Sequence, residues 1–396
     1  MEVTAYIPCF NGAAWLREAI DSLLGQTEAV DELLVIDDGS TDHSAAIAAG
    51  YGAPVRLVRH DRNRGLAAAR NTALREARHH LVASIDADAR AAPDWLAGLL
   101  DGLATPWTAA AGGRLVEACQ ERVADRWRAA HMAQHAGPFP LTNPPVLPGA
   151  NTLVRRDLVL AVGGYDESLR RNYEDTDLQH RLIAAGYRTR YEPGALAYHL
   201  RRDTAQSVLR TCWHWLHPPF ERRGAYETEQ GLMAKFDANA AVARRALWVD
   251  FADGAPARAY LSLCVLLLFP AADLAHAAQR AAERGDPATQ AGLARAASGW
   301  PEMLPHSLDG RSARLSACIA GDVRRLAWWA SGADGSGAPP AAGRRRTGPF
   351  NGGAVETLLD RAVAAVERHV RALPRAWWPA IEDAREALAA EEGWGR

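Results

Sequence analysis

The chain has 396 residues, of which 48% are hydrophobic, and a formal net charge of −2. A chain of this length can bury a full core and exceeds one average domain, so we expect one large domain and a smaller one. The small net charge argues against a nucleic-acid binder. Five cysteines without a Cys-x-x-Cys pair indicate a reducing compartment and neither a zinc site nor a disulfide frame.

The first 90 residues alternate between short apolar segments and helical patterns, as in a parallel α/β sheet. The pattern predicts strands at 3–7, 33–36, 55–58 and 81–85, and helices at 13–24, 44–49 and 66–77. Ligands of open α/β sheets bind outside the carboxyl ends of the strands, so polar clusters there are expected to share one crevice. Three strands are followed by such clusters: Pro8-Cys9-Phe10-Asn11, Asp37-Asp38-Gly39-Ser40 and Asp86-Ala87-Asp88.

The most informative cluster is Asp86-Ala87-Asp88, because two carboxylates follow an apolar strand. Buried carboxylates are costly unless a positive charge lies between them. A divalent cation that carries a phosphorylated ligand is the natural candidate, since hard cations take oxygen ligands. Asp-x-Asp alone is a common pattern, and its weight here comes from the motifs around it.

Two further motifs admit both a structural and a functional interpretation. Asp37-Asp38 precedes residues that can cap the next helix, yet such an aspartate can also accept hydrogen bonds from a base or ribose. Arg70 follows the turn at Asn63-Arg64-Gly65 on a predicted helix. It is either a solvated cation or a guanidinium fork beside a diphosphate.

Acidic residues and a histidine complete the candidate site. Glu174, Asp175 and Asp177 suit a helix N-terminus, but a carboxylate near a metal-bound electrophile can also serve as general base, and we favour Asp175. His199 is either a structural imidazole or one that returns to the aspartate pair and completes a metal shell.

The remainder of the chain predicts a boundary near residue 215, with a catalytic domain at 1–215 and a mainly helical domain at 216–396. The proline-rich segment 137–151 is expected to cross the site as a rigid connection. The apolar run Tyr260–Phe269 is too short to span a bilayer and predicts a buried helix. Segment 331–353 predicts a linker or loop, and 355–373 an amphipathic helix. The start of the chain lacks a basic leader, so we expect a cytoplasmic protein, with peripheral contact at the inner membrane face left open.

Taken in order, these motifs resemble the inverting, non-processive members of glycosyltransferase family 2, and the resemblance covers roughly the first 200 residues. It implies a GT-A-type α/β fold: a mixed, mainly parallel sheet flanked by helices, here with a mostly α-helical C-terminal region. By the same resemblance, Asp175 would be the base with Glu174 beside it, and Asp86, Asp88 and His199 would bind Mn²⁺ or Mg²⁺. The nucleotide-sugar pocket would be lined by Pro8, Asn11, Asp37, Asp38, Asn63, Arg70, Asp86, Ala87, Gly149 and Asn151.

The resemblance implies transfer of one sugar from a nucleotide-sugar, with a UDP-sugar as the first candidate, to a hydroxyl of a saccharide, a lipid-linked glycan or a protein. Segment 206–210 lacks the Gln-x-x-Arg-Trp motif of processive synthases, which favours single transfer. One alternative is a sugar-phosphate nucleotidyltransferase, although no basic glycine-rich loop follows the first strand. The other is a non-catalytic module that only binds nucleotide-sugar.

Overall fold

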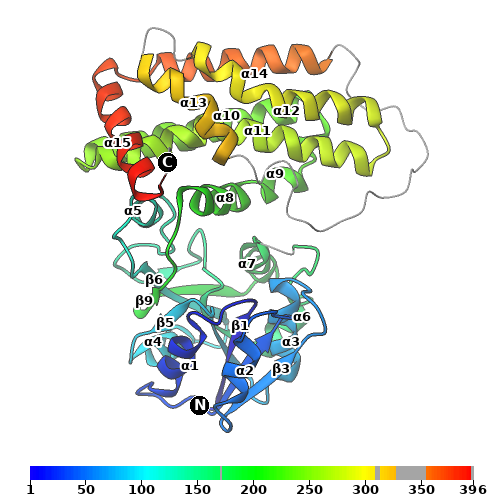
Figure 1. The fold of residues 1–396 in the computed structure, drawn as a ribbon. Helices are drawn as coiled ribbons and strands as arrows, with labels where there is room; N and C mark the ends of the chain where they lie inside the picture. Colours follow the sequence, from blue (N-terminus) through cyan, green and yellow to red (C-terminus); the bar gives the residue numbers. More distant parts are fainter. Residues whose placement is uncertain (170–171, 308–312, 327–353, 394–396) are drawn as a thin grey trace. The chain divides into compact units, whose positions relative to one another are not determined.

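The structure is a computed structural model that describes residues 1–169, 172–307, 313–326 and 354–393 (Figure 1). The predicted linker at 331–353 therefore lies outside the described residues. Two compact units are present: residues 1–120 with 128–202, and residues 121–127 with 203–396. Residues 203–215, which the sequence-based boundary assigns to the first domain, group with the second unit.

The first unit holds the sheet, and the predicted strands and helices of its first 90 residues are confirmed with small shifts at their ends. The strands are β1 (Val3–Cys9), β2 (Glu32–Asp37), β3 (Val55–Arg59), β4 (Leu81–Ile85), β5 (Ala89–Ala91), β6 (Thr108–Glu117), β7 (Leu141–Thr142), β8 (Asn151–Arg155) and β9 (Arg188–His199). Its helices are α1 (Leu16–Leu24), α2 (Ser44–Ala49), α3 (Leu66–Glu76), α4 (Trp95–Gly102), α6 (Arg156–Ala161) and α7 (Glu174–Ala184), while α5 (Val123–His131) is shared between the units.

The sheet has the order β3-β2-β1-β4-β8-β6-β9-β5, with β7 paired to β9. Strands β1 to β4 pair in parallel, β8 runs antiparallel to both β4 and β6, and β9 is parallel to β6. The expected mixed, mainly parallel sheet is confirmed. This topology brings the carboxyl ends of β1, β2, β4, β6 and β9 to one edge, where β8 begins.

Helices cover both faces of the sheet. Successive side chains of a strand point to opposite faces, so each central strand contributes to two cores. On β2, Leu33 and Val35 pack in a core with residues of α1 and α4, whereas Leu34 and Ile36 pack in a second core with residues of α3 and α7. All four side chains are fully buried. The central strands are therefore buried on both faces and mostly apolar, and the acids of the site follow their ends.

The second unit is helical. Its elements include α8 (Ala205–Leu216), α9 (Pro218–Arg222), α10 (Glu229–Ala252), α11 (Ala259–Glu283), α12 (Pro287–Ser307), α13 (Ala313–Leu326), α14 (Ala354–Arg371) and α15 (Trp378–Glu391). The predicted buried helix is α11, which packs against α10 and α12 (Figure 1). By length and composition alone, residues 256–283 could cross a membrane, but 89% of their most apolar window is buried inside the protein. The predicted amphipathic helix at 355–373 is α14.

Candidate active site

A carboxylate–imidazole–carboxylate chain lies at the shared edge of the sheet. Asp88 follows β4, and its Oδ2 lies 3.2 Å from Nε2 of His199, the last residue of β9. Nδ1 of His199 lies 2.8 Å from Oε2 of Glu117, the last residue of β6 and the register partner of His199. The imidazole is therefore held between two acids that come from different strands.

The two acids determine the charge of His199. Burial alone would lower the pKa of the imidazole, but Asp88 and Glu117 raise it to about 10. Desolvation opposes ionisation of Asp88, yet the charge and hydrogen bond of His199 lower its pKa to about 2. Without a bound cation, the pair is therefore an ion pair at neutral pH, and a cation at Nε2 would replace the imidazole proton.

Arg70 of α3 is a buried residue that links Asp86, Glu174 and the loop at Gly149. Only 1% of the residue is exposed. Its Nη1 donates to Ser84 Oγ at 2.7 Å and to the carbonyl of Gly149 at 2.9 Å. Its Nη2 lies 3.1 Å from Asp86 Oδ1, and its Nε lies 3.3 Å from Glu174 Oε1. The guanidinium thus donates to four groups of the protein, and it positions two acids and a loop.

The acids beside Arg70 hold their protons more tightly than usual. Burial raises the pKa of Glu174 to about 8, and the charge of Asp175 adds to this effect, while Arg70 opposes it. Desolvation also raises the pKa of Asp86, again against the charge of Arg70, although 27% of that side chain is exposed. Glu174, of which 2% is exposed, is in effect an interior residue.

Asp175 lies at the start of α7 and is tied to the loop before β8. Its Oδ2 accepts a hydrogen bond from the backbone N–H of Gly149 at 2.8 Å, and its Oδ1 accepts one from the N–H of Thr176 at 2.6 Å. A Cβ at Gly149 would lie 3.0 Å from Asp175 Cβ and 3.1 Å from Arg70 Nη2, so glycine permits this close approach. The proline-rich connection thereby reaches the site at Gly149.

The Asp37-Asp38 pair organises the loops at the ends of β1 and β2. Asp38 accepts hydrogen bonds from the N–H groups of Arg64 and Gly65, both at 2.8 Å, and lies 2.6 Å from His60 Nδ1. Oδ1 of Asp37 accepts the N–H of Ser40 at 3.0 Å. Both aspartates are buried. Asp38 fixes the turn that carries Asn63, an exposed residue.

The other predicted pocket residues differ in how far they can reach a ligand. Asn11 is exposed, and its Oδ1 accepts the N–H of Thr41 at 2.9 Å, which joins the first two loops. Pro8 lies buried in β1 opposite Ile36. Ala87 lies at the edge of the core, with 9% exposed.

Asn151 belongs to the interior of the sheet and presents no exposed surface to a ligand. Its Oδ1 accepts the indole N–H of Trp95 at 2.7 Å, and its Nδ2 donates to the carbonyls of Arg114 and Ala195 at 3.1 and 3.0 Å. All of its polar atoms are therefore bonded to the protein. In this structure Asn151 supports the start of β8, whereas the neighbouring Gly149 lies in the site.

Sequence reasoning missed Glu117 and His60. Glu117 closes β6, so the signal was an acid at the end of an apolar strand, the same signal that marked Asp86. His60 follows β3, and its two ring nitrogens lie 2.6 Å from Asp38 Oδ1 and 2.9 Å from Thr72 Oγ1. It lies in no motif, and only the fold places it against Asp38.

Comparison with known sequences gives matches over part of the chain. Residues 4–163 match the family described as Glycosyl transferase family 2. Over 208 residues the chain is 34% identical to the pre-mycofactocin glycosyltransferase of Mycobacterium tuberculosis. This match covers 51% of the present chain and 43% of the relative. It is 31% identical over 227 residues to the succinoglycan biosynthesis protein ExoO of Rhizobium meliloti, with coverages of 53% and 64%. The chain thus spans less than two thirds of each relative.

Solved structures also resemble parts of the chain. The mannosyltransferase PcManGT from Pyrobaculum calidifontis, in complex with GDP-Man and Mn²⁺, matches with a TM-score of 0.44 and 21% identity, over 85% of this chain and 88% of that one. GalNAc-T7 with UDP, GalNAc and Mn²⁺ matches with a TM-score of 0.43 and 18% identity, over 53% and 47% of the two chains.

Proposed function

From the match of residues 4–163 to glycosyl transferase family 2, we propose that the chain is a metal-dependent, inverting glycosyltransferase. It moves one sugar from a nucleotide-sugar to a hydroxyl of a saccharide, lipid-linked glycan or protein acceptor. A UDP-sugar is the first candidate for the donor. The observation that carries the proposal is that the Arg70 guanidinium links the two sides of the site. It contacts Asp86 on the cation side of the site and Gly149, whose N–H binds Asp175, on the other.

The residues at the sheet edge suit Mn²⁺ or Mg²⁺. Asp88 Oδ2 and His199 Nε2 lie 3.2 Å apart, about the separation of neighbouring ligands on one small cation. Together with Asp86 they would hold the ion, and Glu117 would orient the imidazole through Nδ1, as outer carboxylates commonly do. When bound, the cation supplies positive charge that stabilises the departing diphosphate.

In this proposal Asp175 acts on the acceptor. Its Oδ2 accepts one backbone N–H, from Gly149, and so keeps a lone pair for a further proton, whereas its Oδ1 accepts both the N–H and the Oγ1 hydroxyl of Thr176. In the proposed step the acceptor oxygen attacks C1 of the donor sugar and gives its proton to Asp175. The bond between C1 and the diphosphate oxygen breaks, the nucleoside diphosphate leaves, and the configuration at C1 inverts.

Arg70, Gly149 and Glu174 are positioning residues in this proposal. Arg70 binds Asp86 and Glu174 at once, so it fixes the distance between the cation side and the start of α7. The elevated pKa of Glu174 keeps that side chain largely neutral near pH 7. We place the reaction in the cytoplasm. Peripheral contact of the protein with the inner membrane face would give it access to a lipid-linked acceptor.

The proposal is tested with a panel of nucleotide-sugars in Mn²⁺ or Mg²⁺, with hydrolysis without acceptor and donor-induced thermal shift as readouts. We expect one nucleotide-sugar to be hydrolysed slowly and in a cation-dependent manner. Asp175→Asn should keep the thermal shift and lose about 100-fold or more of the turnover. Pyrophosphate release from a nucleoside triphosphate and sugar phosphate would instead favour a nucleotidyltransferase, and binding without any hydrolysis would favour a non-catalytic module.

A further inference from the structure

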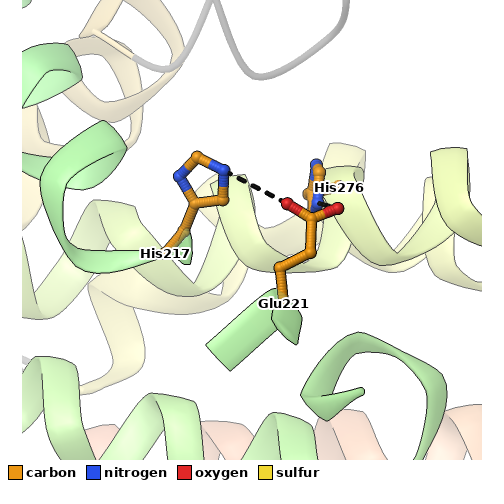
Figure 2. A group of neighbouring side chains, drawn as sticks. All are labelled: His217, Glu221 and His276. Carbon is orange, nitrogen blue, oxygen red and sulfur yellow. Dashed lines mark hydrogen bonds and ion pairs between the residues drawn. The ribbon is translucent and has the colours of Figure 1, made fainter. Parts of the chain in front are cut away.

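Three side chains of the helical unit face one another with the chemistry of a metal site (Figure 2). His217 lies at the junction of α8 and α9, Glu221 lies four residues later on α9, and His276 lies on α11. Nε2 of His217 lies 3.5 Å from Glu221 Oε2, and Nε2 of His276 lies 3.3 Å from Glu221 Oε1. Potential ligand atoms of all three residues lie within 4.8 Å of one another.

These separations suit a shared ion better than direct ion pairs. Charge-assisted N–H···O bonds are usually about 2.7–2.9 Å long. Around a tetrahedral Zn²⁺ with bonds of about 2.0–2.1 Å, neighbouring ligand atoms lie about 3.3 Å apart. The 3.3 Å between His276 Nε2 and Glu221 Oε1 matches the second geometry, and the 3.5 Å between His217 Nε2 and Glu221 Oε2 is longer than a usual charge-assisted hydrogen bond.

The two imidazoles are held in place by aromatic neighbours. Trp213 stacks on His217, with centroids 4.4 Å apart and an interplanar angle of 11°, and meets His276 edge-on at 5.7 Å. Tyr226 also meets His276 edge-on, at 4.7 Å. The indole N–H and the phenol O–H both donate to Asp273, which is fully buried, at 2.8 and 2.9 Å. The ring orientations are thus set by the packing and need no metal.

The cluster is open enough for an ion to enter. The exposed fractions of the side chains are 13% for His217, 34% for Glu221 and 16% for His276. Arg280 pairs with one oxygen of the carboxylate, because its Nε lies 3.6 Å from Glu221 Oε1. Arg280 also pairs with the neighbouring Glu283. Since Glu283 offers it an alternative partner, Arg280 can leave Glu221 when a cation arrives.

We propose that His217, Glu221 and His276 bind Zn²⁺ through two imidazole Nε2 atoms and a carboxylate oxygen, with a fourth position for water. Two nitrogens and one oxygen are a ligand set that suits Zn²⁺, whereas Mg²⁺ and Ca²⁺ prefer oxygen ligands. The five cysteines take no part, which is why the cysteine pattern gave no sign of this site. The ion would join α9 to α11 inside the helical unit.

The test is direct metal binding to the full-length chain without an affinity tag, stripped with EDTA and returned to metal-free buffer. We expect titration with ZnCl₂ to reveal a site that His276→Ala and Glu221→Gln each weaken by at least about tenfold. Co²⁺ in place of Zn²⁺ should give the visible absorption of a tetrahedral complex in the wild-type chain and lose it in both variants.

Two matched variants separate this site from other metal binding. His369→Ala removes a histidine of α14 that pairs only loosely with Asp237, at 3.8 Å, and should leave the Zn²⁺ site intact. Asp88→Ala removes the proposed catalytic ligand and should also leave it intact. Equal Zn²⁺ affinity in the wild-type chain and both ligand variants would overturn the proposal. So would a wild-type chain that gives no tetrahedral Co²⁺ spectrum, an outcome that does not depend on how the variants fold.

Discussion

Nε2 of His199 lies 3.2 Å from Oδ2 of Asp88, although 111 positions separate the two residues along the chain. The pairing of β5 with β9 places Ala89, next to Asp88, opposite His199. Because Glu117 binds the other ring nitrogen, the imidazole is an acid-bound cation when no metal is present. The proposed metal site is thus stabilised by a proton until a metal replaces it.

The first prediction concerns the stability of the metal-free chain. The pKa of His199 is raised from its ordinary 6.5 to about 10 in the folded chain, so the stabilisation from its charge is complete below pH 6.5 and is lost as the pH rises toward 10. In EDTA, the wild-type chain should melt at a higher temperature than His199→Gln at pH 6. This advantage should shrink steadily up to pH 10. A gap that stays constant over this range would show that the ion pair is not formed.

The second prediction concerns Arg70. Arg70→Met leaves Asp86, Glu174 and the Gly149 carbonyl without their buried partner, so we expect a loss of about 3–5 kcal/mol in the free energy of unfolding. The matched control is Arg75→Met on the same helix. Arg75 is exposed and its Nη2 donates only to Thr72 Oγ1 in the hydrogen bonds described, so its loss should change stability by less than about 0.5 kcal/mol. Urea denaturation measures both, and equal effects would contradict the positioning role.

The third prediction concerns Gly149. A methyl group there meets Asp175 Cβ at 3.0 Å and Arg70 Nη2 at 3.1 Å, so Gly149→Ala must shift the proposed base by a few tenths of an ångström. We expect turnover to fall by about 10–100-fold, with donor binding nearly unchanged, since misplacement of a reacting group is costly. Gly194→Ala is the control, because no atom lies within 4 Å of its added Cβ. Steady-state kinetics and donor titration distinguish the outcomes, and full activity of Gly149→Ala would remove this contact from the site.

The fourth prediction concerns Glu174, whose pKa is raised from 4.5 to about 8 in the folded chain. Between these two values the unfolded chain is ionised and the folded chain is not, so Glu174 lowers stability progressively as the pH rises from 4.5 to 8. Glu174→Gln cannot ionise, and its amide oxygen can still accept from Arg70. Its melting temperature relative to wild type should therefore be higher at pH 8 than at pH 5. The same difference at both pH values would mean that Glu174 ionises normally.

The amino-acid sequence by itself determined the local elements and the class of the sheet. The alternation of apolar runs and helical periods predicted β1 to β4 and α1 to α3, because burial on both faces makes each central strand mostly apolar. It also marked the strand ends, since a polar residue after an apolar strand stands out along the chain. The amphipathic α14 followed from its helical period, and the buried α11 followed from the unbroken apolar run Tyr260–Phe269.

Which polar residues meet was decided only by the tertiary structure. Local sequence does not specify that β8 inserts antiparallel between β4 and β6, yet this insertion brings Gly149 to Arg70 and turns Asn151 into the sheet. The parallel pairing of β6 with β9 likewise sets Glu117 beside His199. Propensity and periodicity act over a few residues, whereas strand order depends on packing across the whole sheet. That is why the acids were visible in the sequence but their partners were not.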